Sequence, residues 1–403
     1  MHSPLVTIVT PSYNQGRFIR ATIESVLSQD YPHIEYIIMD GGSTDETAEI
    51  VKEYASRLTW ISEKDRGQSH AINKGFRMAK GEIVAWLNSD DLYLPGAVST
   101  AVRRFEQGPG LGAVYGEGYQ IDVDGKVKQR FPVTEPFNLW KLVYLSDYIL
   151  QQTVFFRKAA LDEVGEIDEK LNWGMDWDIL IRLGKSFQLG YIPEFMGCLR
   201  EYGDAKSFSG GRRRFRELAR LLRRHTQMRF PPGYLTYGID TYARVWCGWI
   251  ERVTPRPLTR PSAWFQTRLR GVLHYILAHT VREAQGWYTD GWATTTARFM
   301  MPPGNGQLRL RGSLPRIGDA LAGQVIRVEC NGVVRDVPID FGEFDFTVNT
   351  RTGELLNITL RAKRFVVPKP PGRVQDRRRL AYQLKSIEWD DRIERHRSAS
   401  AVQ

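Results

Sequence analysis

Residues 82–91 read EIVAWLNSDD, an apolar run of strand length that ends in an amide, a hydroxyl and two carboxylates. A continuous apolar run of this length is typical of a strand that is buried on both faces. Similar runs occupy residues 5–10, 34–39 and 58–61, and each is followed by a stretch with helical periodicity. Strands that alternate with helices predict an α/β domain with a mostly parallel, twisted sheet flanked by helices. Such sheets bind ligands outside the carboxyl ends of their strands, so the polar loops after these strands are candidate binding loops.

Composition limits the class of protein. The chain has 403 residues, of which 42% are hydrophobic and 25% charged, as in globular proteins, and this length predicts two or three domains. The formal net charge of +10 favours an anionic partner, such as a nucleotide diphosphate, an acidic lipid surface or a charged glycan. Three cysteines without CxxC spacing predict neither a disulfide framework nor a zinc site.

The sequence shows no signal-peptide pattern and no run of eighteen apolar residues. We therefore expect a cytoplasmic protein, with peripheral contact at the inner face of the cell membrane as an alternative.

The pattern changes along the chain and predicts four parts. After residue 287, strand-like runs such as 325–330 and 356–361 are separated by Gly and Pro, which predicts a small antiparallel β-sandwich. A sandwich of this size could bind carbohydrate or form a homo-oligomer. The predicted parts are a catalytic domain (1–210), a helical, Arg-rich extension or linker (211–286), the sandwich (287–390) and a tail (391–403).

The loop after the second predicted strand reads DGGSTDE over residues 40–46. Its two glycines let a ligand approach the backbone, and the helix that follows begins with a partial positive charge that attracts anions. A capping box explains Ser43 and Glu46. It does not explain Asp40, whose carboxylate could accept hydrogen bonds from a base or a ribose.

The fourth strand ends in Asp90 and Asp91, two adjacent carboxylates that repel each other unless a cation lies beside them. Mg²⁺ typically uses one or two carboxylates plus substrate phosphates, and Mn²⁺ accepts the same oxygen ligands. The alternative is that one of the two caps the helix that starts near Pro95. The crowded polar loop over residues 63–75 favours a shared pocket. The residues of this loop that could contact a nucleotide diphosphate are Asp65, Asn73 and Lys74.

Four segments, in this order and at these intervals, resemble a family 2 glycosyltransferase of the GT-A fold. They are residues 10–14 (TPSYN), 40–45 (DGGSTD), 65–75 (DRGQSHAINKG) and 88–91 (NSDD). The resemblance covers about residues 5–210. It implies a GT-A-like sheet and the inverting transfer of a sugar from a nucleotide-diphosphate sugar to an acceptor hydroxyl, dependent on Mn²⁺ or Mg²⁺.

The resemblance also implies roles for individual residues. Asp40 and Asp65 would hold the nucleoside, Asp90 and Asp91 would bind the metal, and Asn88 replaces the first Asp of an Asp-x-Asp signature. The donor contacts that it implies are Pro11, Tyr13, Asn14, Asp40, Asp65, Gln68, Asn73, Lys74, Asn88, Ser89 and Asp90. In a later loop we expect Arg200 or Lys206 to help the diphosphate leave.

A downstream segment, residues 173–183, resembles the stretch that carries the catalytic base in this family. By position Asp176 is the predicted base, with Met175 in place of a Glu. Asp178 is the alternative, and its spacing places it about 200° around a helix from Asp176, so that only one of them readily faces the pocket. The predicted acceptor contacts are Gln152, Trp173 and Trp177, with core packing as the alternative for the two tryptophans.

Residues 212–229 contain eight arginines and one glutamate around an apolar stripe. This stripe could pack onto the catalytic domain while the arginines face water. Alternatively, the helix could contact anionic lipid or a lipid-linked acceptor. No nucleic-acid-binding motif is present, so we expect no nucleic-acid partner.

The leading interpretation is a glycosyltransferase of cell-envelope or exopolysaccharide synthesis that acts on a glycan or a lipid-linked glycan. The alternative is a catalytically silent sugar- or nucleotide-binding protein that uses the sandwich for recognition. A nucleotidyltransferase would normally carry a Gly-rich, basic phosphate loop after the first strand. This chain instead reads PSYN at residues 11–14, which argues against that class of enzyme.

Overall fold

The chain forms two compact units, residues 1–137 with 142–244 and residues 138–141 with 245–403. The computed structural model describes residues 3–132, 134–202, 206, 210–235, 237–238, 241–242, 286–287, 291–304, 307–316, 319–350, 353–367 and 379–390. Most of the predicted helical extension (211–286) after residue 242, and the tail 391–403, lie outside these ranges. The domain boundaries expected after residues 210, 286 and 390 stay predictions.

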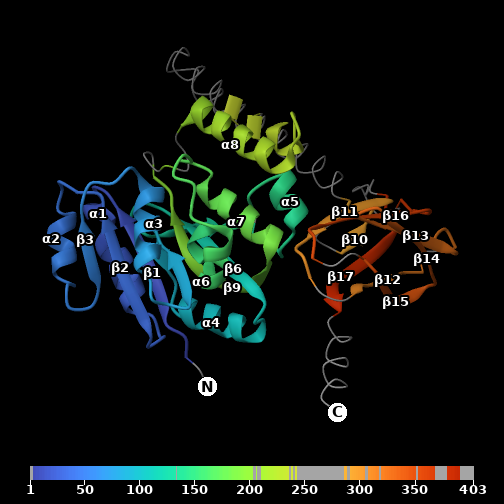
Figure 1. Cartoon of the computed structure of the whole chain (residues 1–403), viewed down its shortest axis with the longest axis horizontal. Helices are drawn as coiled ribbons and strands as arrows, with labels where there is room; N and C mark the ends of the chain where they lie inside the picture. Colours follow the sequence, from blue (N-terminus) through green and yellow to red (C-terminus); the bar gives the residue numbers. More distant parts are fainter. Residues whose placement is uncertain are drawn as a thin grey trace. The chain divides into compact units, whose positions relative to one another are not determined.

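The first unit is built on one sheet (Figure 1). Its strands are β1 (Val6–Ser12), β2 (Ile34–Asp40), β3 (Thr59–Ser62), β4 (Ile83–Trp86), β5 (Leu92–Tyr93), β6 (Leu111–Ile121), β7 (Val127–Arg130), β8 (Phe155–Arg157) and β9 (Gln188–Arg200). Among the described residues their order is β3-β2-β1-β4-β8-β6-β9-β5, with β7 paired to β6. β1 to β4 pair in parallel, as do β6 and β9, and β8 joins the two sets through antiparallel ladders. The predicted α/β fold is confirmed.

The bounds of the helices are α1 (Gly16–Leu27), α2 (Thr47–Lys52), α3 (Gln68–Met78), α4 (Ala97–Gln107), α5 (Leu139–Tyr144), α6 (Lys158–Val164), α7 (Met175–Ser186) and α8 (Gly211–Thr226), with a short 3₁₀ turn η1 (Gln151–Thr153). Several helices, namely α1, α3, α4, α6 and α7, contact strands of this sheet, as expected of helices with an apolar face. In α1, for example, Ile19, Ile23 and Val26 are fully buried and join Ile8 of β1 in the main core. No helix within the described ranges has the length and apolar character needed to cross a membrane.

The parallel register places the ends of three strands side by side. Ser12 at the end of β1 lies opposite Asp40 of β2, and Asp40 lies opposite Ser62 of β3. The chain then leaves β2 through Gly41, whose N–H donates a 2.8 Å hydrogen bond to the Ser12 carbonyl. The polar loops that follow these strands therefore start along one edge of the sheet, as expected for parallel strands.

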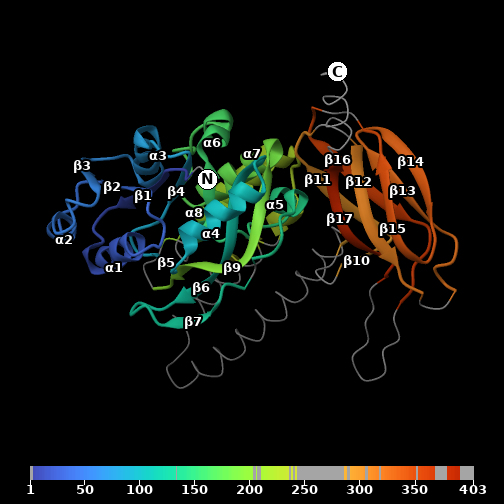
Figure 2. The ribbon, with the colours of Figure 1, turned by 90° about the horizontal axis from the view of Figure 1, so that it is seen from below.

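The second unit is a sandwich of two antiparallel sheets (Figure 2). Its strands are β10 (Trp292–Ala293), β11 (Thr296–Met301), β12 (Gln307–Leu314), β13 (Gln324–Cys330), β14 (Val333–Ile339), β15 (Gly342–Val348), β16 (Leu356–Ala362) and β17 (Tyr382–Asp390). One sheet has the order β10-β17-β12-β15 and the other β11-β16-β13-β14 in the described residues. Alternate residues of β12 are buried, so that Leu308 and Leu310 meet Val328 and Leu360 of the facing sheet. The predicted antiparallel sandwich is confirmed.

Candidate active site

Asp40 ends β2 as a buried carboxylate, with 2% of its surface exposed. Its side chain accepts 2.5 Å hydrogen bonds from the hydroxyls of Ser43 and Ser62, and the Ser43 N–H adds a bond of 3.1 Å. These donors satisfy a buried charge that would otherwise be costly. These hydrogen bonds orient Asp40 at the edge of the sheet where the resemblance predicts the nucleoside.

Gly41 is the point on which three loops converge. A Cβ atom on Gly41 would lie 2.7 Å from Oδ2 of Asp65 and 3.3 Å from Cδ2 of Tyr13. The absence of a side chain therefore lets Asp65, from the loop after β3, and Tyr13, from the loop after β1, approach the end of β2. The Asp65 carboxylate is oriented by a 2.7 Å hydrogen bond from the N–H of Gly67, and the Tyr13 side chain is 61% exposed.

Asn14 follows Tyr13 in the left-handed backbone region, with φ of 52°. Its side-chain oxygen accepts a 2.8 Å bond from the Thr44 N–H, and its own N–H donates a 2.8 Å bond to the Ser43 hydroxyl. Asn14 therefore ties the loop after β1 to the loop after β2. Pro11 lies within the fully buried strand β1.

Asp91 is buried, with 1% of its surface exposed. Its carboxylate accepts hydrogen bonds from Nδ2 of Asn88 (3.0 Å), Nε2 of Gln152 (2.6 Å) and the backbone N–H of Arg200 (2.9 Å). Burial and the adjacent charge of Asp90 raise the pKa of Asp91 to about 8. Asp91 is therefore committed to internal contacts that brace the turn after β4.

Asp90 is only partly buried, and Tyr202 donates a 2.7 Å hydrogen bond to its Oδ2. Burial raises the pKa of Asp90, while the Tyr202 hydroxyl and the Arg200 charge oppose that rise. Arg200 itself is 4% exposed, and its guanidinium donates to the backbone carbonyls of Asp90 (2.8 Å), Asp122 (3.1 Å) and Val123 (2.9 Å). Arg200 thus holds the Asp90 turn in place, and its donors are directed at backbone rather than at an open pocket.

A line of three polar side chains connects the start of α3 to this turn. Lys206 Nζ donates a 2.6 Å bond to Oε1 of Gln68, and Gln68 Nε2 donates a 2.6 Å bond to Oδ1 of Asn88. Asn88 in turn donates to Asp91. Burial lowers the pKa of Lys206, and the charge of Asp176 partly offsets this effect. A cation from the loop after β9 therefore lies among the groups that the sequence assigned to the donor.

Asp176 lies in the first turn of α7 and is half-buried, with its Oδ1 accepting a 2.8 Å bond from the N–H of Trp177. Burial raises the pKa of Asp176, although the charges of Lys206 and Arg214 oppose the rise. Asp147 lies close enough to interact electrostatically, since burial and the Asp176 charge raise the pKa of Asp147 well above its ordinary value. Asp147 stands in a loop without a motif, so sequence reasoning missed it.

Asp178 has a different environment, with 1% of its surface exposed. It forms ion pairs with Arg182 (2.9 Å) and Arg224, and Nε2 of His225 donates a 2.7 Å hydrogen bond to its Oδ1. Burial would raise its pKa, but these partners outweigh that effect and lower the pKa to about 2. A carboxylate that is already paired in this way is a poor proton acceptor, so the geometry favours Asp176 over Asp178 as the base.

The three residues expected at the acceptor are placed differently. Trp177 is 2% exposed, and its indole N–H donates a 2.7 Å bond to the Leu142 carbonyl, a position that suits a core residue. Gln152 is also buried and holds Asp91. Trp173 is half-buried beside Gly210, where a Cβ atom would lie 2.5 Å from the indole ring. Of the three, Trp173 is the best placed for contact with a ligand.

Three of the expected donor contacts lie in supporting positions. Asn73 forms two hydrogen bonds with the backbone of Ile167. Its Nδ2 donates to the Ile167 carbonyl (2.9 Å), and its Oδ1 accepts from the Ile167 N–H (3.0 Å). Lys74 forms an ion pair with Glu63. Ser89 is buried, and its carbonyl accepts a 2.9 Å bond from the Thr22 hydroxyl. These side chains brace the loops around the site.

The fit of a divalent cation can be judged from the donor set. In the described residues no group of three or more His, Cys, Asp and Glu side chains gathers as a metal cage. One partly exposed carboxylate, that of Asp90, stands two residues after Asn88 and accepts a hydrogen bond from Tyr202. Such a site suits a hard cation that takes one or two carboxylates from the protein and the remaining oxygens from a diphosphate.

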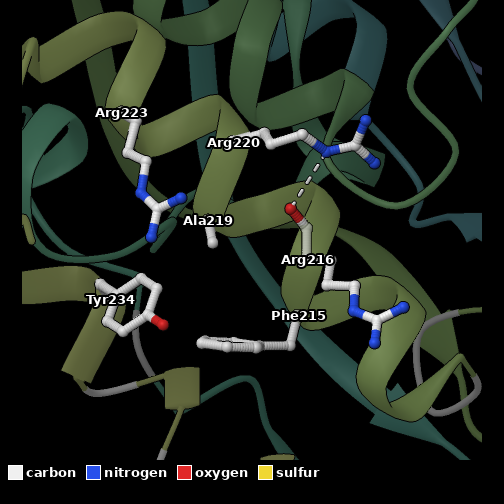
Figure 3. Close-up of a pocket in the computed structure, with 6 residues that line it drawn as sticks. All are labelled: Phe215, Arg216, Ala219, Arg220, Arg223 and Tyr234. Carbon is white, nitrogen blue, oxygen red and sulfur yellow. Dashed lines mark hydrogen bonds between the residues drawn. The ribbon is translucent and has the colours of Figure 1, made fainter. Parts of the chain in front are cut away.

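A shallow hollow of about 290 Å³ lies on α8, and none of the carboxylates described above lines it (Figure 3). Its floor is apolar, and arginines extend around it, with Arg220 Nε bonded to the Arg216 carbonyl at 3.3 Å. The residues that line it are Phe215, Arg216, Ala219, Arg220, Arg223 and Tyr234. The opposite face of α8 buries Leu218, Leu221 and Leu222, so the apolar stripe predicted from the sequence packs against the protein.

The comparisons with known proteins concern the unit that carries this site. Residues 7–165 match the family described as Glycosyl transferase family 2. An uncharacterized glycosyltransferase of Rickettsia prowazekii is 27% identical over 186 residues, which cover 44% of this chain and 58% of that protein. Chondroitin synthase of Escherichia coli is 31% identical over 185 residues, which cover 45% of this chain and 27% of that protein. The matched region thus spans less than two thirds of these relatives.

Among solved structures, S. aureus TarS 1-349 in complex with UDP-GlcNAc superposes with a TM-score of 0.47 at 16% identity. The superposition covers 70% of this chain and 93% of the TarS chain. The sequence match includes β1 to β4 and the loops after them, which contain Asp40, Asp65 and Asp90. Residues 7–165 of this chain thus match glycosyl transferase family 2, and the rest of the chain lies outside that match.

Proposed function

We propose that this protein is an inverting glycosyltransferase that moves a sugar from a nucleotide-diphosphate sugar to an acceptor hydroxyl. The observation that carries the proposal is the line of hydrogen bonds from Lys206 through Gln68 and Asn88 to Asp91. These hydrogen bonds join the loops after β9, β3 and β4, and the charge of Asp176 acts on Lys206. Transfer requires such proximity, because the groups that bind the donor must lie next to the base that acts on the acceptor. The match of residues 7–165 to glycosyl transferase family 2 supports the same reaction class.

The nucleoside would lie at the end of β2. The carboxylates of Asp40 and Asp65 accept hydrogen bonds from base and ribose in this proposal. The exposed ring of Tyr13, next to Gly41, offers an apolar face on which a base can stack.

Asp90 is the residue that would hold a divalent cation, Mn²⁺ or Mg²⁺. Asp91, with its three internal donors, positions the turn instead. When bound, the cation neutralises charge on the diphosphate, which makes the nucleoside diphosphate a better leaving group. Lys206 adds a positive charge next to Gln68 on the same side.

Asp176 acts as the general base. Its carboxylate takes the proton from the acceptor hydroxyl, whose oxygen attacks the anomeric carbon from the face opposite the departing diphosphate. A single displacement of this kind inverts the configuration. Burial raises the pKa of Asp176, and a carboxylate with a raised pKa is a stronger base.

A panel of nucleotide-diphosphate sugars, each incubated with Mn²⁺ or Mg²⁺ and an acceptor panel, tests the reaction. We expect transfer from at least one donor, abolished by a chelator and reduced at least about 100-fold in Asp176→Asn, with donor affinity retained. Wild-type turnover in Asp176→Asn would refute the base. Donor binding without any transfer or hydrolysis would instead support a catalytically silent sugar-binding protein.

The product is proposed to be a polysaccharide of the cell envelope or an exopolysaccharide, made at the cytoplasmic side. One relative, at 31% identity, is named chondroitin synthase, and that name denotes an enzyme that makes a polysaccharide. In this proposal the β-sandwich binds carbohydrate or joins two copies of the chain. Glycan oligosaccharides as acceptors, with product length as the readout, test this part.

Membrane contact is proposed for the outer face of α8. The hollow there combines an apolar floor with Arg216, Arg220 and Arg223, a pattern that suits an anionic headgroup above an acyl chain (Figure 3). Co-sedimentation should show binding to vesicles that contain phosphatidylglycerol and none to phosphatidylcholine vesicles. Replacement of the three arginines by Ala should abolish binding without loss of transfer to a water-soluble acceptor, and unchanged binding would refute this contact.

A further inference from the structure

Glu217 is an acidic residue on the buried face of the arginine-rich helix α8, with 6% of its surface exposed. It lies beside Leu218 and Leu221, which are also buried and which approach the same Gly174. A buried carboxylate is costly unless it is paired or hydrogen-bonded. The partners of Glu217 therefore show what the residue is for.

Those partners are three successive backbone N–H groups. Oε1 of Glu217 accepts hydrogen bonds from the N–H groups of Asn172 (2.9 Å), Trp173 (2.6 Å) and Gly174 (3.0 Å). These groups immediately precede α7, and a row of successive backbone N–H groups forms a concave site for an anion. The Glu217 carboxylate fills that site.

Helix α7 lacks a side-chain cap from its own sequence, since Gly174 occupies the N-cap position. A negative charge near the first turn of a helix is favourable because it complements the partial positive charge there. Glu217 provides this charge from 43 residues further along the chain. The start of α7 thus depends on α8.

Packing holds the two helices at this distance. A Cβ atom on Gly174 would lie 2.8 Å from Leu221 Cδ1 and 2.9 Å from Leu218 Cδ2, so the backbone before α7 is in direct contact with α8. At the other end of α8, His225 and Arg224 bind Asp178. Asp176 therefore lies in the turn of α7 that α8 holds from both sides.

We propose that Glu217 is a positioning residue that fixes the first turn of α7 and thereby orients Asp176 toward the acceptor hydroxyl. This inference rests on the proposed function, in which Asp176 is the base. Misplacement of a reacting group by about 1 Å can reduce a rate about 100-fold. Glu217 thus connects the arginine-rich helix to catalysis without touching either substrate.

The experiment compares Glu217→Ala with Glu117→Ala. Glu117 is a matched control because it is also buried (2% exposed), and its hydrogen-bond partners, Arg130 of β7 and Tyr191 of β9, do not belong to α7. In Glu217→Ala we expect kcat to fall about 10- to 100-fold, with the KM for the nucleotide sugar changed by less than about threefold. Glu117→Ala should lower the unfolding midpoint comparably but leave kcat within about threefold of wild type.

Glu217→Gln should restore most of the activity, because the amide oxygen still accepts hydrogen bonds from the three N–H groups. Glu217→Asp, whose carboxylate is one methylene shorter, should remain impaired. The acidic limb of the pH–kcat profile, which reports Asp176, should shift in Glu217→Ala and Glu217→Asp but not in Glu117→Ala.

Equal kcat in wild type and in folded Glu217→Ala or Glu217→Asp would overturn the inference. Should Glu217→Ala not fold, the Asp and Gln variants decide alone. Asp176→Asn separates the two proposals: if it keeps turnover, the base assignment fails, whereas if it is inactive and the Glu217 variants are unimpaired, only the positioning role fails.

Discussion

Tyr202 donates a 2.7 Å hydrogen bond to the carboxylate of Asp90, although 112 residues separate the two in the sequence. Of the Asp90–Asp91 pair, Asp91 is buried and Asp90 is partly exposed. The bond from Tyr202 therefore orients one oxygen of the more accessible carboxylate. A group that orients a metal ligand in this way typically changes metal affinity when it is removed.

We therefore expect Tyr202→Phe to raise the concentration of Mn²⁺ needed for half-maximal activity by about tenfold, with kcat at saturating metal reduced less. A metal titration of transfer activity measures this. Tyr54→Phe, which removes a hydroxyl that bonds to Glu24 at the surface, is the control. An unchanged metal requirement in Tyr202→Phe would show that Asp90 does not hold the cation.

Gly41→Ala tests the proposal that the nucleoside binds at the end of β2, where Asp65 and Tyr13 approach Gly41. The added methyl group would lie 2.7 Å from Asp65 Oδ2, so the carboxylate must move. We expect the Kd for the nucleoside diphosphate, measured by calorimetry, to rise about tenfold. Gly110→Ala is the matched control, since a Cβ there meets nothing within 4 Å. Equal affinities in the two variants would contradict the placement of the nucleoside.

The ion cluster around Asp178 predicts a pH-dependent stability. The pKa of Asp178 is about 2 in the folded protein and about 4 when unfolded, so its contribution is complete above about pH 4 and is lost as the pH falls toward 2. Burial lowers the pKa of His225, and its bond to Asp178 only partly offsets this, so stability already declines as the pH falls below about 6.5.

Asp178→Asn should lower the free energy of unfolding by about 3 kcal/mol at pH 7, because the charges of Arg182 and Arg224 lose a buried partner. The difference from wild type should shrink as the pH falls from about 4 to 2. Urea denaturation at several pH values measures it. A constant difference over this range would show that Asp178 is not the ionised centre of the cluster.

Arg200→Ala should destabilise the protein, since it leaves three backbone carbonyls at the Asp90 turn and in the β6–β7 connection without their donor. We expect the free energy of unfolding in urea to fall by about 3 kcal/mol. Arg57→Ala, which removes one exposed bond to the Leu27 carbonyl, should change it by less than about 0.5 kcal/mol. If Arg200→Ala instead kept full stability and raised only the KM for the donor, Arg200 would be a diphosphate ligand.

The run at residues 34–39 and its counterparts were sufficient to predict the parallel half of the sheet, because buried strands and amphipathic helices leave different periodicities. Strand β9 (Gln188–Arg200) was not predicted, because it carries Gly190, Pro193 and Gly197 and is exposed in its middle. Its place in the sheet comes from pairing with β6, more than sixty residues away, which no local pattern records.

The amino-acid sequence alone determined the fold class and the loops of the site, because parallel strands bring every strand-end loop to the same edge of a sheet. Only the tertiary structure distinguished the environments of Asp90 and Asp91, and of Asp176 and Asp178, on which the proposed roles rest. In each pair the two side chains are chemically identical and differ in burial and in distant partners, such as Gln152, Tyr202 and His225. The proposed role of Glu217 likewise depends on the tertiary structure, because its three N–H partners precede α7, whereas Glu217 lies on α8.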